Sequence, residues 1–105
     1  MFQHALAKGV KIGFGTDAGV YAHGRNAEEF HLMVDLGMRP IDALRSAASS
    51  DAELLGLQDK IGTLEPGKLA DVVGVPGDPV KNVRQTEHVL FVMKEGIIYK
   101  NEPAK

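Results

Sequence analysis

One short stretch, Gly9 to Gly19, limits what this chain can fold into, because it joins a strand pattern to a carboxylate. Apolar residues occupy every second position from Val10 to Phe14, which is the period of a β-strand. The run passes directly into Asp17. An apolar strand that ends in a carboxylate is how α/β proteins present a reactive group at the carboxyl edge of a sheet. An Asp there can equally accept backbone N–H bonds in a turn, so the residues alone leave both roles open.

Composition sets broad limits on the function. A chain of 105 residues is one domain at most, and its 44% hydrophobic content is that of a globular protein. A net charge of -2 without clustered Lys or Arg argues against nucleic-acid binding. No apolar run is long enough to span a membrane, and the first residues lack the pattern of a signal peptide. The absence of cysteine excludes disulfides and thiolate chemistry. We therefore expect a cytoplasmic protein that binds neither membranes nor nucleic acids.

Helix signals lie on both sides of the predicted strand. A short helical segment beginning near Phe2 is expected to end at Gly9, where glycine can adopt a left-handed cap. After a loop, Asn26 has the pattern of an N-cap, with Glu29 completing a capping box. The helix that follows is expected to end at Gly37.

Two further short helices are predicted next. Pro40 suits the first position of one, although Arg39 before it is a poor N-cap that the sequence does not explain. The other is expected to be capped by Ser50 or Asp51 and to end at Gly56.

The second half of the chain has the signals of β-structure. Pro66–Gly67 fits the centre of a type II turn, and residues 70–75 form an apolar run of strand length. Residues 89–93 and 97–99 are rich in β-forming residues, and the short link 94–96 contains glycine. This spacing predicts a hairpin.

The pattern therefore divides the chain into an α/β part, residues 1–57, and a β-rich part, residues 58–105. The first part has a single strand, which cannot form a sheet alone. Its apolar composition favours burial between neighbouring strands. Either it pairs with the C-terminal strands, or another chain supplies its neighbours.

The order of motifs resembles a known family. The motifs are GVKIGFGTDAG (9–19), HGxNAxEF (23–30), GMxPxxALR (37–45), AELLGL (52–57), IGxLxPGKLADVV (61–73) and GDP (77–79). Together they resemble the C-terminal part of a metal-dependent amidohydrolase, of the imidazolonepropionase-like and Xaa-Pro dipeptidase-like branch. The resemblance extends over almost the whole chain, and two unrelated local signals keep the spacing of the family.

The resemblance implies a fold and a chemistry. The strand would be the eighth of a (β/α)8 TIM-like barrel, and the β-rich part would belong to a small β-sandwich. Asp17 would lie at the barrel mouth, contact the metal and act as proton shuttle. Zinc lowers the pKa of a bound water to about 7, and a nearby carboxylate can move its proton to a leaving nitrogen. The implied reaction is zinc-dependent hydrolysis of a C–N bond in a small amide, cyclic amide or dipeptide.

The other metal ligands of the family have no counterpart here, because the chain is expected to begin just before the eighth strand. A catalytic zinc needs about three protein ligands, and only Asp17 matches one. His23, in the loop after Asp17, is a candidate for substrate binding or for loop structure. His4, His31 and His88 are expected to have surface or packing roles.

Three hypotheses follow from the incomplete ligand set. The chain is the C-terminal portion of an amidohydrolase, or one half of a split hydrolase completed by a second chain. Alternatively, it is a non-catalytic truncated domain that self-associates through its unpaired strand into a homo-oligomer. The residues fix neither the substrate nor the number of metal ions.

Overall fold

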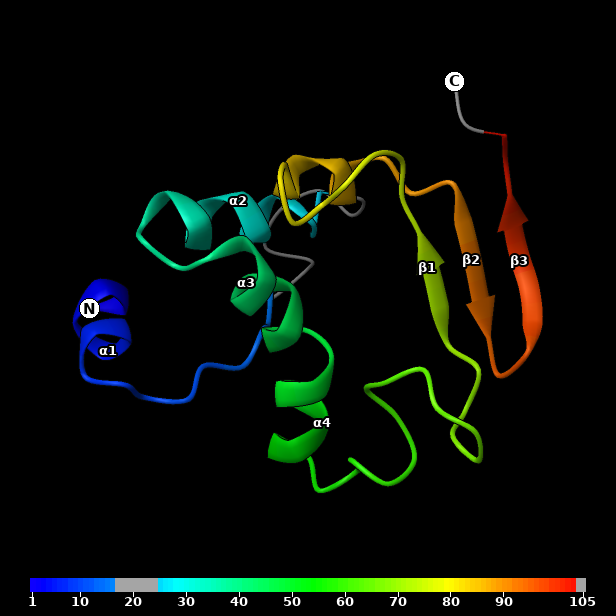
Figure 1. The fold of residues 1–105 in the computed structure, drawn as a ribbon, viewed down its shortest axis with the longest axis horizontal. Helices are drawn as coiled ribbons and strands as arrows, with labels where there is room; N and C mark the ends of the chain where they lie inside the picture. The colour runs from blue at the N-terminus through cyan, green and yellow to red at the C-terminus, as the bar shows by residue number, and fades with distance from the viewer. Residues whose placement is uncertain (17–24, 104–105) are drawn as a thin grey trace.

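The computed structural model describes residues 1–16 and 25–103, and helices and a small sheet occupy opposite sides of it (Figure 1). The elements are α1 (Phe2–Ala7), α2 (Glu28–Asp35), α3 (Pro40–Ser46), α4 (Ser49–Leu54), β1 (Val72–Gly74), the 3-10 helix η1 (Val83–Glu87), β2 (Phe91–Lys94) and β3 (Ile97–Asn101). In the part of the chain that is described, no helix is long and apolar enough to cross a membrane.

The segment between α1 and Thr16 differs from its prediction. Helix α1 ends as expected at Gly9, which has a φ of 74°. The segment predicted as a strand from Val10 to Phe14 belongs to no hydrogen-bonded ladder among the described residues, so its pairing as a strand stays a prediction. The described sheet consists of β1, β2 and β3, so of the two alternatives the pairing of this segment with the C-terminal strands is wrong, and neighbours supplied by another chain stay a prediction. A strand exists only through pairing with a neighbour, and a periodic sequence does not supply one.

The alternation of the segment is nevertheless kept in its burial. Ile12, Phe14 and Thr16 are partly buried, whereas the residues between them are exposed. The Phe14 ring stacks on Phe30 of α2 with 4.4 Å between the ring centroids. The core of this half consists of Met33, Met38 and Ala43, with Phe2, Leu6, Ile12, Phe14, Phe30 and Val34 packed against it. From Ile12 onward the period-2 pattern therefore indicates which side chains face the core, whereas Val10 is exposed.

Helix α2 begins later than the capping-box pattern predicts. Its N-cap is Ala27, and no side chain caps it. The amide of Asn26 instead donates its Nδ2–H to the Oγ1 atom of Thr16, at 3.1 Å. The capping-box prediction is therefore wrong. The predicted end is confirmed, because Gly37 follows the helix with a φ of 113°.

Helix α3 begins at Pro40, as predicted. The structure explains Arg39 before it, whose Nε–H donates to Oδ2 of Asp42 at 2.8 Å. That hydrogen bond lowers the pKa of the Asp42 carboxyl. The Arg39 side chain thus reaches an acidic residue of the first turn, where a negative charge also interacts well with the helix dipole.

Helix α4 begins two or three residues earlier than expected. Its N-cap is Ala48, so Ser50 and Asp51 lie inside the first turn, and the prediction that either caps the helix is wrong. The carboxylate of Asp51 bonds to another segment instead. The helix ends near Gly56, which has a φ of 72°, as predicted.

The three strands form an antiparallel sheet in the order β1-β2-β3. The predicted hairpin is confirmed: Glu95 and Gly96 join β2 to β3 with φ values of 51° and 82°. Positive φ at both central residues is the geometry of a type I′ turn. The strand predicted over residues 70–75 is shorter, because Ala70 and Asp71 accept hydrogen bonds from the turn residues Gly96 and Glu95 rather than pairing in the ladder. The predicted turn at residues 66–67 is confirmed by the φ of 89° at Gly67 and by the bond from Lys68 N–H to the Glu65 carbonyl.

The 3-10 helix η1, which the sequence does not indicate, connects the two halves. It packs against α2, and its Val83 is buried. Asn82 caps it by accepting the Arg84 backbone N–H at 3.2 Å. The Arg84 guanidinium lies 3.3 Å from His31 Nδ1 on α2. This contact places the sheet beside the helical layer.

Candidate functional site

The two residues predicted for the site, Asp17 and His23, lie outside the described residues. Their roles as catalytic carboxylate and substrate-binding histidine therefore stay predictions. The structure describes the two flanks of this segment, which end at Thr16 and begin again at Arg25.

The incoming flank is attached to helix α4. The backbone N–H of Phe14 donates to Oδ1 of Asp51 at 2.9 Å, and the two residues are 37 positions apart in the sequence. Gly13 lies directly against the same carboxylate, because a Cβ at this position would come within 2.5 Å of Oδ1. A glycine at position 13 thus allows Asp51 to approach the backbone.

The two flanks are also attached to one another. Asn26 Nδ2 donates to Thr16 Oγ1 at 3.1 Å, so the chain returns close to the point where it leaves the described residues. Arg25 donates to Glu28 through Nε at 2.5 Å and through Nη2 at 3.1 Å. The hydrogen bond from Arg25 lowers the pKa of the Glu28 carboxyl. The outgoing flank is thereby fixed to the first turn of α2.

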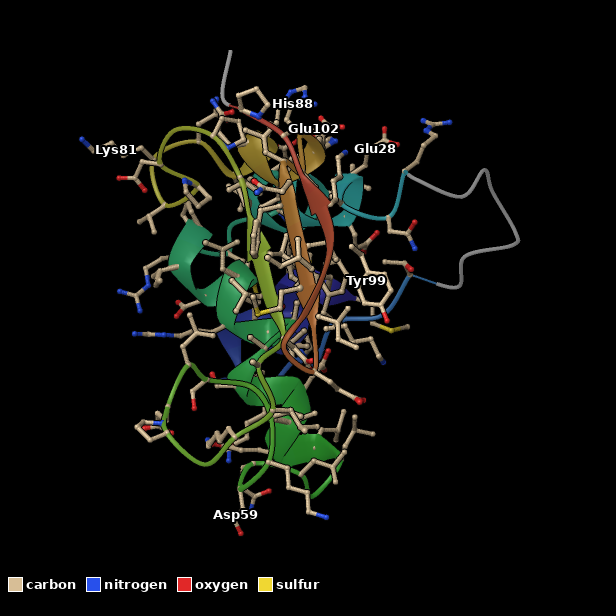
Figure 2. All side chains as sticks on the ribbon, turned by 90° about the vertical axis from the view of Figure 1, so that its right-hand side faces the viewer. Glu28, Asp59, Lys81, His88, Tyr99 and Glu102 are labelled. Carbon is tan, nitrogen blue, oxygen red and sulfur yellow. The ribbon has the colours of Figure 1, made fainter. Side chains whose placement is uncertain are left out.

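The described histidines agree with their predicted surface and packing roles. His31 is partly buried, with Nδ1 placed 3.2 Å from Oδ2 of Asp35. His4 is exposed on α1. His88 is exposed near Glu102 at one end of the sheet (Figure 2). Among the described residues, no three His, Cys, Asp or Glu side chains gather closely enough to hold a metal ion. These residues alone therefore do not fit a zinc site.

Two hollows lie between the halves. An apolar groove of about 790 Å³ runs between the helical layer and β1, with Phe14, Phe30 and Leu44 on one side and Val73 on the other. A second, of about 740 Å³, is bordered by charged residues at the end of the sheet, and its lining includes Glu87, His88, Lys100 and Glu102. Neither hollow brings together a metal-binding group among the described residues.

Comparison with known proteins decides the family. The family model described as the amidohydrolase family matches residues 1–99. The chain belongs to the amidohydrolase family. This confirms the resemblance to metal-dependent amidohydrolases that the motifs indicate.

Two curated relatives are similar over part of the chain. A 5-methylthioadenosine/S-adenosylhomocysteine deaminase of Desulforudis audaxviator (strain MP104C) is 37% identical over 78 residues, which are 65% of this chain and 18% of the relative. An imidazolonepropionase of Symbiobacterium thermophilum (strain DSM 24528 / JCM 14929 / IAM 14863 / T) is 34% identical over 65 residues, or 62% of this chain and 14% of the relative. The chain thus spans less than a fifth of the length of either.

A solved structure extends the likeness to the fold. The crystal structure of a Xaa-Pro dipeptidase with bound methionine in its active site superimposes with a TM-score of 0.92 and 47% identity. It covers 95% of this amidohydrolase chain, whereas the chain covers 25% of the dipeptidase. The imidazolonepropionase-like and dipeptidase-like character expected from the motifs is confirmed by these relatives.

The sequence does not indicate the hydrogen bonds that hold Phe14 and Thr16, on the incoming flank of the Asp17 segment. Asp51 and Asn26 both have the residue types of helix caps, and the sequence assigns them that role. In the structure, each instead bonds to the segment that precedes Asp17. No local signal in a single sequence identifies a partner so distant along the chain.

Proposed function

We propose that residues 1–105 are the C-terminal portion of a metal-dependent amidohydrolase that hydrolyses a C–N bond in a small amide, cyclic amide or dipeptide. The observation that carries the proposal is the 47% identity and TM-score of 0.92 with a Xaa-Pro dipeptidase over 95% of the chain. A likeness of this degree over nearly all of the chain favours a shared chemistry. Among the three substrate classes, the likeness to a dipeptidase favours a dipeptide.

The division of the chain follows from the same likeness. Residues 1–57 are proposed to contribute the last strand and following helices of a (β/α)8 barrel, and residues 58–105 a part of its β-sandwich. The segment before Thr16 has strand-like alternation but no ladder partner among the described residues. A barrel strand whose neighbours lie elsewhere has these two properties.

Asp17 is the proposed catalytic residue. It directly follows the segment whose backbone Asp51 holds, and its motif matches the proton-shuttle carboxylate of the family. Its role is to accept a proton from the attacking water and deliver it to the leaving nitrogen. His23 is proposed to contact the substrate.

Zinc is the proposed cofactor, with one or two ions. When bound, it supplies a water of lowered pKa. Asp17 is its proposed ligand in this chain. The described residues alone provide no metal-binding group, so the remaining ligands must come from outside them. We therefore propose that the active species includes a further stretch of polypeptide, either continuous with this chain or supplied as a complementing chain.

The first experiment is native mass spectrometry of the 105-residue chain, with zinc added and then chelated, followed by an assay of zinc-dependent hydrolysis of Met-Pro. We expect neither stoichiometric zinc nor hydrolysis from the chain alone. We expect both when the polypeptide bearing the other ligands is present, with hydrolysis abolished by Asp17→Asn. Hydrolysis that is unaffected by Asp17→Asn would overturn the proposal. A metal-free homo-oligomer without activity in either preparation would favour the non-catalytic, self-associating domain.

A further inference from the structure

We propose that Asp51 is a positioning residue for the amidohydrolase reaction, which fixes the backbone immediately before Asp17. The inference deepens the proposed function and rests on it. Its basis is the juxtaposition of an α4 carboxylate with the Gly13–Thr16 segment, at 2.9 Å from the Phe14 N–H. Phe14 stands three residues before Asp17 in the sequence.

The contact satisfies a backbone donor that has no strand partner among the described residues. A backbone N–H that loses its water without gaining an acceptor costs about 1–3 kcal/mol. In a regular sheet, a neighbouring strand would supply the acceptor. Here the carboxylate oxygen of Asp51 does so from a helix, and a charged acceptor makes a stronger bond than a neutral one.

The contact between Asp51 and the Phe14 N–H requires a glycine at position 13, because the carboxylate lies close to the Gly13 backbone. A Cβ there would lie 2.5 Å from Oδ1 and 3.1 Å from Cδ2 of Leu54, so any larger residue would displace the carboxylate. At Gly15 a Cβ would meet no described atom within 4 Å. The two glycines therefore form a matched pair in one segment, of which only Gly13 touches Asp51.

Two further contacts restrict the same segment. Phe14 stacks on Phe30, which limits rotation of the segment about its axis. Thr16 accepts a hydrogen bond from Asn26, which limits the displacement of Thr16 relative to the residues just before α2. Asp51 adds a third restraint from a different helix, so the backbone is held from two sides. Positioning of this kind matters for catalysis, because a displacement of about 1 Å at a reacting group can cost a hundredfold in rate.

The test begins with amide hydrogen exchange of Phe14, measured by NMR in the 105-residue chain. We expect exchange of this amide to be about tenfold faster or more in Asp51→Ala and in Gly13→Ala than in the unmodified chain. Asp51→Asn keeps an acceptor oxygen in the same place, and Gly15→Ala leaves Asp51 undisturbed. Both should retain most of the protection. The double variant Ser50→Asp/Asp51→Ala restores the first-turn charge of α4, and it should still show fast exchange.

The second readout is steady-state hydrolysis of Met-Pro with zinc, by the enzyme completed with the polypeptide that supplies the other ligands. We expect Asp51→Ala and Gly13→Ala to lower kcat by about tenfold to a hundredfold, with KM changed less than about threefold. Asp51→Asn and Gly15→Ala should keep kcat within about threefold of the unmodified enzyme.

The outcomes separate the two proposals. Equal exchange of the Phe14 amide in Asp51→Ala and the unmodified chain overturns the positioning role, whatever the activity. The same holds if Asp51→Ala keeps its kcat while Asp17→Asn is inactive, and the proposed function then survives. If Asp17→Asn is fully active, the proposed function fails and the catalytic part of this inference fails with it.

Discussion

The helical half and the sheet half of this chain are held together in different ways. In the helical half, Met33, Met38, Ala43 and Ala52 are at most 6% exposed, so packing defines the structure. Among the described residues of the sheet half, the buried apolar residue is Val83, and it lies on η1 rather than on a strand. The sheet is defined mainly by hydrogen bonds between its strands.

The edge strand β3 shows the difference most clearly. Its apolar residues Ile97, Ile98 and Tyr99 are 60%, 53% and 66% exposed, and the Tyr99 side chain projects to one side of the β3 ribbon (Figure 2). A sheet normally gains stability when one face packs against a second layer. The described residues provide no such layer for β3. Strand β3 is thus fully hydrogen-bonded although its apolar side chains are not packed against a second layer.

The largest expected effect contrasts one methionine from each half. Met33 is 4% exposed in the helical core, whereas Met93 is only partly buried on β2. We expect Met33→Ala to lower the free energy of unfolding by about 2–5 kcal/mol, because it removes buried methylenes and leaves a cavity. Met93→Ala should cost less than half as much. Urea unfolding of the two variants measures the difference, and equal losses would contradict the contrast drawn between the halves.

A smaller effect is expected where the sheet half meets α4. Gly62 has a φ of 99°, and a Cβ there would lie 2.7 Å from Ala52 Cβ and 3.2 Å from the Ala48 carbonyl oxygen. We expect Gly62→Ala to cost about 2–4 kcal/mol, from backbone strain and overpacking together. Gly67→Ala is the control, because Gly67 has a similar φ of 89° with no described atom within 4 Å. It should cost about 1 kcal/mol, the backbone contribution alone. Thermal unfolding of both variants measures the difference. Equal shifts in Tm would show that overpacking at Gly62 contributes nothing to the loss of stability.

The smallest expected effect is a pH dependence in the helical half. The hydrogen bond from Arg39 lowers the pKa of Asp42 in the folded state below its ordinary value of 3.8. A lowered folded-state pKa stabilises the protein above the unfolded-state pKa, and this stabilisation is lost as the pH falls through the folded-state pKa. Both groups are exposed, so the contribution is small. We expect Arg39→Gln to reduce the acid dependence of unfolding below pH 4, measured by urea titration at several pH values. Lys81→Gln, a change at an exposed lysine of the other half, should leave it unaltered.

Features that depend on neighbouring residues could be predicted from the sequence, whereas features that depend on partners far along the chain could not. Helix ends at Gly9, Gly37 and Gly56 could be predicted, because a glycine with positive φ is a local event. The turn at Glu95–Gly96 is local for the same reason. The caps predicted at Asn26 and in α4 do not form. The side chains of Asn26 and Asp51 bond to partners elsewhere in the chain, which the sequence could not indicate.

The candidate site shows the same limit. The assignments of Asp17 and His23 rest on the resemblance of the surrounding motifs to the amidohydrolase family, and they remain proposals. The contact of Asp51 with Phe14 joins residues 37 positions apart and has no sequence signal. The predicted strand shows a related limit. Alternation indicates the burial of Ile12 and Phe14 but not of Val10, which is exposed, and pairing depends on neighbours that the sequence of this segment does not encode.

The bond between Thr16 and Asn26 has a consequence for how such a chain can diversify. It holds together two residues that are ten positions apart in the sequence. The entropic cost of closing a loop grows only with the logarithm of its length, by about 0.6 kcal/mol for each doubling. Insertions and substitutions between these two residues are therefore cheap for the framework.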